Sequence, residues 1–197
     1  MWKKSWTDTV MSSSMSALIF DLSAPVSESL YWDASFLVHA VYQAGRYHRE
    51  CYAFLERLSN SQNTLSYVST LTIDETIFTL IQLKVLEDHP GEGFWEVYRR
   101  DPQIIQRYMG ELRLLVERLS VDPRIQLVGT EQGDLAAMMD YMDRYACLPR
   151  DAMHLAVMAR LGISSIVTTD DDFAPVEGLR SSPAILVFSR ETEFSGL

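Results

Sequence analysis

Five acidic residues are spaced so that folding could gather their side chains at one site: Asp33, Glu75, Asp151, Asp170 and Asp172. Asp33 and Asp170 each follow a short run that predicts a buried strand, and sites in open α/β sheets form outside the carboxyl ends of strands. Carboxylates gathered there would repel one another unless a cation neutralised them. Their oxygens are hard ligands that suit Mg²⁺ or Mn²⁺. The pattern therefore predicts a site for a divalent cation.

Each acid also has an ordinary structural interpretation when it is taken alone. Asp33 and Asp151 are good helix N-caps, and for either residue alone that is the favoured interpretation. Glu75 alone is better explained as a solvated helix residue, and the acids from Asp170 to Asp172 could form a polar turn after a strand. What favours a functional site is their joint placement, because two acids end predicted strands and one starts the helix that feeds the second strand.

The stretch from Asp151 to Phe173 carries the densest part of this pattern. We expect its helix to be capped by Asp151, because Pro149 favours an extended chain just ahead of it. Gly162 is expected to end the helix. The β-branched run from Ile163 to Val167 is typical of a strand buried in a parallel sheet. The stretch thus predicts an acid at a helix start and further acids at a strand end.

The remaining chain divides into alternating strands and helices. Strands are expected over Ser29–Trp32, Thr64–Val68, Ile125–Val128 and Ala184–Phe188, while Ala17–Phe20 is open between a small edge strand and a loosely docked arm. Helices are expected over about 36–45, 48–58, 71–84 and 131–145, together with a helical pair over about 94–119 that is interrupted near 101–102. This alternation favours an α/β fold with a mostly parallel sheet and helices on both faces.

Two of these helices carry a predicted cap. Ser69 or Thr70 is expected to cap the helix at 71–84, which contains Glu75, and Thr130 is expected to cap the helix at 131–145. His39 and His154 fall in helices near the predicted site. Simple packing is the favoured interpretation of both histidines, and contact with a substrate is the less favoured one.

Composition limits the classes of function. The 197 residues carry a formal net charge of −10, which argues against a nonspecific surface for polyanions but leaves room for a local basic rim. No apolar run approaches the roughly 20 residues that span a bilayer, and no signal-peptide pattern is present. Cys51 and Cys147 are interpreted as reduced, small apolar residues. We therefore expect a cytoplasmic protein without a membrane segment.

Four segments of the chain resemble the PIN-domain family, in particular its VapC-type ribonuclease toxins. They are YWDASFLVHA from Tyr31, STLTIDETIF around Glu75, LPRDAMHLAVMARLGI from Leu148, and SIVTTDDDF from Ser165. The order and spacing of all four make the match specific, and the resemblance covers roughly Ser29 to Phe188. It implies a three-layer α/β/α fold and metal-dependent cleavage of RNA.

The resemblance also implies roles for single residues. The four acids of the family motif fall on Asp33, Glu75, Asp151 and Asp170, and Asp172 matches a further acid that many members have. Our hypothesis is that Asp33, Asp151 and Asp170 are direct ligands of Mg²⁺ or Mn²⁺, whereas Glu75 and Asp172 bind a second ion or orient water. Ser35 and Thr168 match small hydroxyl positions beside the acids, for which we expect a supporting role.

We expect a PIN-like domain over residues 28–190, an N-terminal extension over 1–27 and a tail over 191–197. A helical insertion at about 87–122 makes this part of the chain longer than in compact family members. An amphipathic helical pair with a solvated face is its favoured interpretation, and a clamp for RNA or a partner is the alternative. The candidate RNA-contacting residues are Arg46, Arg49, Arg99 and Arg100.

Three functions stay open at this point. The leading one is a metal-dependent endoribonuclease, with the toxin half of a toxin–antitoxin pair as a more specific form of it. The resemblance implies a homodimer and an antitoxin protein as partners. The second is a PIN-like binding module that recruits a protein or RNA without catalysis. The third, ranked low, is a phosphatase with an aspartate nucleophile, whose chemistry wants a second aspartate two residues after Asp33, where this chain has Ser35.

Overall fold

The computed structural model describes residues 18–19, 26–61, 63–173, 176 and 184–187. Within these residues, six strands form one sheet in the order β1-β6-β5-β2-β3-β4, and every neighbouring pair is parallel. The strands are β1 (Leu18–Ile19), β2 (Ser29–Trp32), β3 (Leu65–Ser69), β4 (Ile125–Val128), β5 (Ile166–Thr168) and β6 (Ala184–Val187). The parallel sheet confirms the expected fold class.

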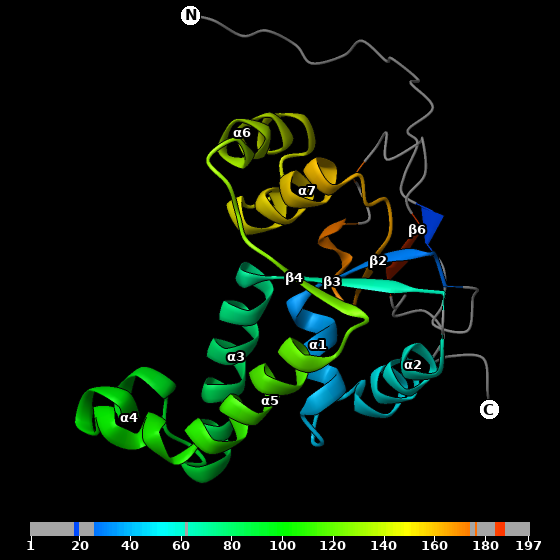
Figure 1. Cartoon of the computed structure of the whole chain (residues 1–197). Coiled ribbons are helices and arrows are strands. Elements are labelled where there is room, and N and C mark those ends of the chain that lie inside the picture. The colour runs from blue at the N-terminus through cyan, green and yellow to red at the C-terminus, as the bar shows by residue number, and fades with distance from the viewer. Residues whose placement is uncertain (1–17, 20–25, 62, 174–175, 177–183, 188–197) are drawn as a thin grey trace, which may run out of the picture.

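Helices cover both faces of this sheet, which gives three layers (Figure 1). One face carries α6 (Asp134–Tyr145) and α7 (Pro149–Leu161). The other face carries α1 (Ala34–Val41), α2 (His48–Asn60), α3 (Thr70–Asp88) and α5 (Met109–Val121). Between α3 and α5 the chain forms α4 (Phe94–Arg100) and a short 3₁₀ helix, η1 (Pro102–Arg107), inside the range predicted as a helical insertion.

The strand β2 lies at the centre of the core because both of its faces are covered. Leu30 and Trp32 point to the side of α1 and α2, where they pack with Phe36. Tyr31 points to the opposite side and packs against Leu155 of α7. Successive residues of a strand alternate between faces, so the three consecutive large residues Leu30, Tyr31 and Trp32 are buried on both.

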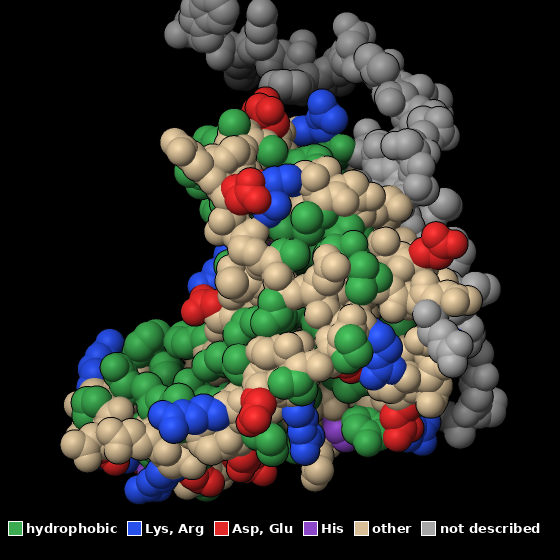
Figure 2. All heavy atoms as spheres, in the orientation of Figure 1, with side chains coloured by type: hydrophobic (Ala, Val, Ile, Leu, Met, Phe, Trp, Pro, Cys, Tyr) green, Lys and Arg blue, Asp and Glu red, His purple; other side chains and the backbone are tan. Residues whose placement is uncertain are grey.

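A third apolar cluster joins α3 to the helices that follow it, and includes Val85, Val97 and Ile104. Beside it, Phe78 and Trp95 are 37% and 52% exposed. Figure 2 shows hydrophobic side chains gathered over the α3 and α4 part of this face. The helical pair is therefore attached to the domain by a packed core of its own and carries an apolar outer surface.

Two predicted helix starts are wrong. The helix α7 begins at Pro149 with Leu148 as its N-cap, so Asp151 lies inside the first turn instead of capping the helix. Proline is tolerated there because the first amides of a helix need no intrahelical partner. The helix α6 begins at Asp134 and not at Glu131, so Thr130 does not cap it.

Other boundaries agree more closely with expectation. Ser69 caps α3 by accepting a hydrogen bond from the Thr72 amide at 3.0 Å. Gly162 ends α7 in the left-handed conformation, with φ of +66°. Leu18 and Ile19 form an edge strand, as one of the two interpretations of that segment proposed. Ala17, Phe20, Phe188, most of the extension and the whole predicted tail lie outside the described residues.

Two further properties concern the described part of the chain. None of its helices is both long and apolar enough to cross a membrane. Cys51 is buried and Cys147 is partly buried, and neither forms a disulfide.

Candidate metal centre

A cleft of about 800 Å³ lies beside the carboxyl ends of β2 and β5, between α1, α3 and the start of α7. Its lining includes all the acids singled out in the sequence: Asp33, Glu75, Asp151, Asp170 and Asp172. They come from four separate parts of the chain, which the parallel sheet brings together because its strands end at one edge. Their assignment as metal ligands stays a prediction, but the fold places them as a shared site requires.

Asp33 connects the end of β2 to α1 and is only 5% exposed. It is the N-cap of α1, and its Oδ2 atom accepts a hydrogen bond from the Ser35 amide at 3.2 Å. The same oxygen accepts a short bond from the Ser35 hydroxyl and one from Thr168 Oγ1 at 2.7 Å. These donors fix the carboxylate and satisfy Oδ2, so Oδ1 is the oxygen left to face the other site residues.

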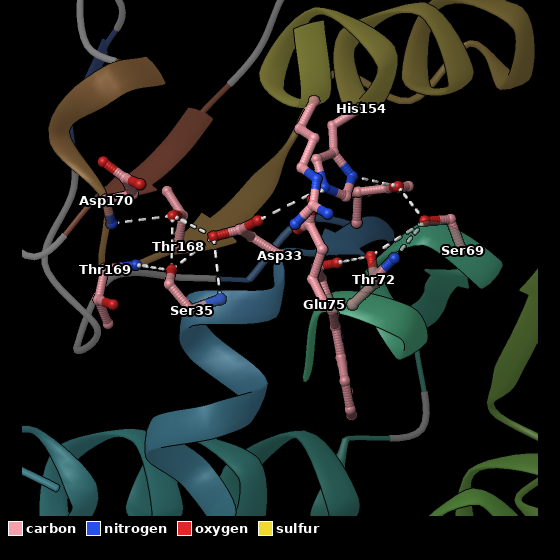
Figure 3. Close-up of polar contacts among 12 residues, drawn as sticks. Asp33, Ser35, Ser69, Thr72, Glu75, His154, Thr168, Thr169 and Asp170 are labelled. Carbon is pink, nitrogen blue, oxygen red and sulfur yellow. Dashed lines mark hydrogen bonds and ion pairs between the residues drawn. The ribbon is translucent and has the colours of Figure 1, made fainter. Parts of the chain in front are cut away.

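Ser35 and Thr168 also hold the loop that follows β5 (Figure 3). The Thr169 amide donates to Ser35 Oγ at 2.9 Å, and the Asp170 amide donates to Thr168 Oγ1 at 2.9 Å. The two hydroxyls lie 3.0 Å apart. The network ties the backbone that carries Asp170 to the carboxylate of Asp33, so the predicted supporting residues set the spacing between two of the acids.

Glu75 reaches the cleft from α3. Its Oε2 atom lies 3.2 Å from His154 Nε2, and its Oε1 atom lies 3.3 Å from Arg150 Nε. That second contact is an ion pair whose geometry does not make a hydrogen bond, and Oε1 is a buried atom without a hydrogen-bond partner among the described residues. A buried carboxylate oxygen in this state costs free energy, and a cation would relieve that cost.

Asp151 carries the clearest electrostatic sign of a cation site. Burial raises its pKa, and the charges of Asp170 and Asp172 raise it further, to about 6. The folded protein therefore disfavours the ionised form of Asp151 in the absence of a counter-charge. Together with the unsatisfied oxygen of Glu75, this shows that the residues present fit a divalent cation.

His154 lies on α7, beside the carboxylates of Asp33 and Glu75, and is 1% exposed. Its Nε2 atom lies 3.9 Å from Asp33 Oδ1, in addition to its contact with Glu75. Asp33, Glu75 and His154 each offer one ligand atom, and these three atoms lie within 4.8 Å of one another. His154 is thus part of the site, although the sequence favoured simple packing for it.

Arg150 is the other site residue that the sequence reading missed. Of the side chains that line this cleft in the described part of the chain, it is the one arginine or lysine. Its position directly before Asp151 was the available signal, because a residue at the start of that helix faces the same edge of the sheet. Its side chain is 60% exposed, so it can reach a ligand that enters the cleft.

The arginines predicted to contact RNA lie elsewhere and do not line the cleft. Arg46 stacks on the Tyr47 ring, with its guanidinium carbon 5.1 Å from the ring centre. Arg49 pairs with Glu50 at 3.6 Å. Arg100, at the end of α4, forms an ion pair with Glu92, which lies in the turn before α4. Arg99 is exposed on α4. Their role in binding RNA stays a prediction.

The arrangement combines a cluster of carboxylates with one exposed cation at its rim. Hard oxygen ligands of this kind hold divalent ions such as Mg²⁺ or Mn²⁺. An exposed guanidinium beside them is suited to a phosphate group, which it can bind with two parallel hydrogen bonds. The chemistry that this set of groups supports is hydrolysis at a phosphate centre.

Comparison with protein families gives one match that covers most of the chain. The family model described as the PIN domain matches residues 30–179. The similar solved structures include the sarcin–ricin-loop-cleaving toxin VapC20 of Mycobacterium tuberculosis, at 16% identity and a TM-score of 0.49, covering 73% of this chain and 92% of that one. No curated protein sequence matches the chain.

Two further solved structures are also similar to the chain. FitAcB from Neisseria gonorrhoeae matches at 12% identity and a TM-score of 0.45, covering 80% of this chain and 96% of that one. VapBC2 from Rickettsia felis, bound to a DNA fragment from its promoter, matches at 10% identity and a TM-score of 0.44, covering 81% and 96%.

Proposed function

Because the chain belongs to the PIN domain family, we propose that it is a metal-dependent endoribonuclease that hydrolyses phosphodiester bonds in RNA. The observation that carries this proposal is the convergence of five carboxylates on one cleft at the carboxyl edge of the sheet. The excess of negative charge there is relieved by the cation that the reaction needs. The four sequence segments that resemble VapC-type toxins support RNA as the substrate.

The ligands that we propose for Mg²⁺ or Mn²⁺ are the carboxylates of Asp33, Asp151 and Asp170. Glu75 and Asp172 bind a second ion or orient water. Asp33 is held for this role by Ser35 and Thr168, which leave its Oδ1 atom facing the site. Asp172 is exposed and therefore stands at the solvent side of the cluster.

A divalent ion, when bound, supplies Lewis-acid chemistry, which activates water as a nucleophile and offsets charge that builds on the phosphate. The protein's own contribution is position and charge. Arg150 stands at the rim, where its guanidinium can bind a phosphate oxygen and orient the backbone of the RNA. The hydrogen bonds of Ser35 and Thr168 keep the carboxylates of Asp33 and Asp170 from moving apart as the substrate enters.

The test is cleavage of a mixed RNA pool by the purified full chain, titrated with Mg²⁺ or Mn²⁺, beside the variant Asp33→Asn. Asparagine is as good an N-cap as aspartate, so the variant keeps the start of α1 while losing the charge. We expect metal-dependent cleavage by the wild-type chain and its loss in the variant. Circular dichroism of both proteins checks that the fold is kept.

Two outcomes would speak against this function. Cleavage that survives in both Asp33→Asn and Asp151→Asn would remove the assigned ligands from the reaction. Absence of both cleavage and metal binding would favour the alternative of a PIN-like binding module, in which the acids serve as helix-start and turn residues.

We further propose that the chain is the toxin of a toxin–antitoxin pair and acts as a homodimer. The support is the resemblance of the segments around Asp33, Glu75, Asp151 and Asp170 to VapC-type toxins. Growth arrest on expression of the wild-type chain, with normal growth on expression of Asp33→Asn, is the expected result. Sedimentation of the purified Asp33→Asn protein measures the oligomeric state, and a monomer would contradict the dimer.

A further inference from the structure

A buried series of hydrogen bonds leads from a backbone carbonyl to His154 (Figure 3). Thr72 Oγ1 donates to the carbonyl oxygen of Trp32 at 2.9 Å, and it lies 3.0 Å from Ser69 Oγ. Tyr31 donates its hydroxyl proton to Ser69 Oγ at 2.7 Å. The same tyrosine oxygen lies 2.8 Å from His154 Nδ1. These groups come from four elements, β2, β3, α3 and α7, so the series is a product of the fold.

The carbonyl at one end fixes the direction of every bond in the series. The carbonyl of Trp32 can only accept, so the single proton of the Thr72 hydroxyl is committed to it. Ser69 must then donate to Thr72, and Tyr31 has donated its proton to Ser69. The tyrosine oxygen is left as an acceptor, so Nδ1 of His154 must carry the hydrogen. The remaining ring nitrogen, Nε2, is the one that faces the carboxylates.

The surroundings of Nε2 match those of a metal ligand. It lies 3.2 Å from Glu75 Oε2 and 3.9 Å from Asp33 Oδ1. In an octahedral site with bonds of about 2.1 Å, neighbouring ligand atoms are about 3 Å apart. Nε2 can face these oxygens in two ways: with a hydrogen that it donates to Glu75 Oε2, or with a lone pair that binds a cation lying between them. The oxygen of Asp33 on this side is also the one that Ser35 and Thr168 leave uncommitted.

From this geometry we propose that His154 is a direct nitrogen ligand of the ion in the cleft, and that the site therefore prefers Mn²⁺ to Mg²⁺. Histidines that bind metals commonly donate their other ring nitrogen to a partner that fixes the tautomer, and Tyr31 has that role here. Imidazole favours transition metals, whereas Mg²⁺ prefers oxygen ligands only. This inference rests on the proposed function, because the ion is the one that the nuclease reaction uses.

The experiment is pulsed electron paramagnetic resonance of Mn²⁺ bound to the full chain, made with natural-abundance or ¹⁵N-labelled histidine. We expect modulation from a directly bound histidine nitrogen that changes with the label. The variant His154→Gln should abolish this signal, and His39→Gln is the matched control because His39 lines the same cleft. In equilibrium dialysis against both ions, His154→Gln should lower the preference for Mn²⁺ over Mg²⁺.

A second variant guards against misfolding of His154→Gln. Tyr31→Phe keeps the packed ring but removes the acceptor of the Nδ1 hydrogen, so Mn²⁺ affinity should fall by about tenfold or more while the nitrogen signal persists. Bound Mn²⁺ without a histidine signal, or a signal that survives in His154→Gln, overturns the inference and leaves the carboxylate site standing. A wild-type chain that binds no Mn²⁺ or Mg²⁺ overturns the inference and the proposed function together.

Discussion

At the level of single residues, the hydroxyl of Ser35 is one of the two hydroxyls that hold the Asp33 carboxylate. It donates to Asp33 Oδ2 and accepts from the Thr169 amide at 2.9 Å, so its loss loosens both the carboxylate and the loop after β5. Residues that orient metal ligands typically contribute about 10- to 100-fold to metal affinity. We expect Ser35→Ala to weaken Mn²⁺ binding by that order, as measured by isothermal titration calorimetry.

The control for Ser35→Ala is Ser120→Ala. Ser120 is exposed on α5, and its hydroxyl donates to the Val116 carbonyl within the same helix. The substitution Ser120→Ala also removes one hydroxyl oxygen but lies away from the site, so the Mn²⁺ affinity of this variant should equal that of the wild-type chain. Equal Mn²⁺ affinities in the wild-type chain, Ser35→Ala and Ser120→Ala would show that the Ser35 hydroxyl does not orient Asp33.

The raised pKa of Asp151 predicts how the folding stability of the metal-free chain depends on pH. Burial and the neighbouring acids raise its pKa from 3.8 to about 6, so the folded chain binds this proton more tightly than the unfolded chain. The resulting stabilisation is complete below the unfolded pKa and is lost as the pH rises through 6. Asp151→Asn removes the charge, and in EDTA it should therefore raise the melting temperature above pH 6 more than below pH 4.

Circular dichroism melts at several pH values measure this effect. Added Mn²⁺ favours the ionised carboxylate, so it should stabilise the wild-type chain more above pH 6 than below it. An Asp151→Asn curve that runs parallel to the wild-type curve at every pH would contradict the assignment.

Replacement of Arg150 should change the KM for RNA much more than kcat. Its exposed guanidinium stands at the rim of the cleft, so it would contact the RNA in the ground state and the transition state alike. Loss of one charge-assisted hydrogen bond is worth about 1.5–3 kcal/mol, so Arg150→Gln should raise KM by roughly tenfold or more with little change in kcat. Arg144→Gln, on α6, removes an exposed arginine that does not line the cleft and should leave KM unchanged.

At the level of elements, the helices α6 and α7 end in the same conformation with different residues. Ala146 ends α6 at φ of +53° and Gly162 ends α7 at φ of +66°. A left-handed residue with a Cβ atom costs roughly 1 kcal/mol more than glycine in the same place. Gly162→Ala should therefore destabilise the chain by about 1 kcal/mol, and Ala146→Gly should stabilise it by a similar or smaller amount.

Urea denaturation measures both variants, and each is the other's control. Apart from its chain neighbours, no described residue has an atom within 4 Å of a Cβ placed on Gly162, so the cost of alanine there is conformational and not a clash. Changes of the same sign in the two variants would show that contacts, and not the backbone conformation, decide these helix ends.

The sequence predicted most elements because their signals are local. The strand before Asp33 was predicted with its observed limits, Ser29–Trp32, from apolar residues followed by an acid. Two errors came from contacts that are distant in sequence or from a competing local rule. Asp134 is held by the Glu131 amide and by Arg160 from α7, so the chain turns before α6 begins. The strand expected from Ile163 starts at Ile166, because the Ile163 amide bonds back to Met158 at the end of α7.

The same distinction explains which parts of the site could be predicted. Acids at strand ends follow a positional rule, so the sequence sufficed to propose that Asp33 and Asp170 would lie near each other. The role of His154 depends on Tyr31 and Glu75, which lie 123 and 79 residues away along the chain. A single buried histidine in an apolar helix carries no sign of such partners, so packing was the better interpretation until the fold was known.

At the level of the whole molecule, charge limits how RNA can bind. The chain has a net charge of −10, and on the face shown in Figure 2 basic side chains alternate with acidic and apolar ones instead of forming a band. Arg150 is the arginine that lines the cleft among the described residues, so few phosphates are neutralised. For one or two contacts with single-stranded RNA, the logarithm of affinity should fall with the logarithm of salt concentration at a slope of about −0.7 to −1.4.

Fluorescence anisotropy of Asp33→Asn with a labelled RNA, across a series of KCl concentrations, measures this slope without cleavage. A slope steeper than about −3 would require several more phosphate contacts. In that case Arg46, Arg49, Arg99 and Arg100 would be the residues to replace next, because they were the predicted RNA contacts outside the cleft.

The strand order also determines when the site can exist during protein synthesis. β2 is made early, but its neighbour β5 and the Thr168 hydroxyl that holds Asp33 come 135 residues later. Asp151, His154 and Asp170 also belong to this late part of the chain. A growing chain therefore lacks part of the metal-binding set until translation has passed Asp170. The proposed nuclease site can assemble only after that segment has been made and has folded against β2.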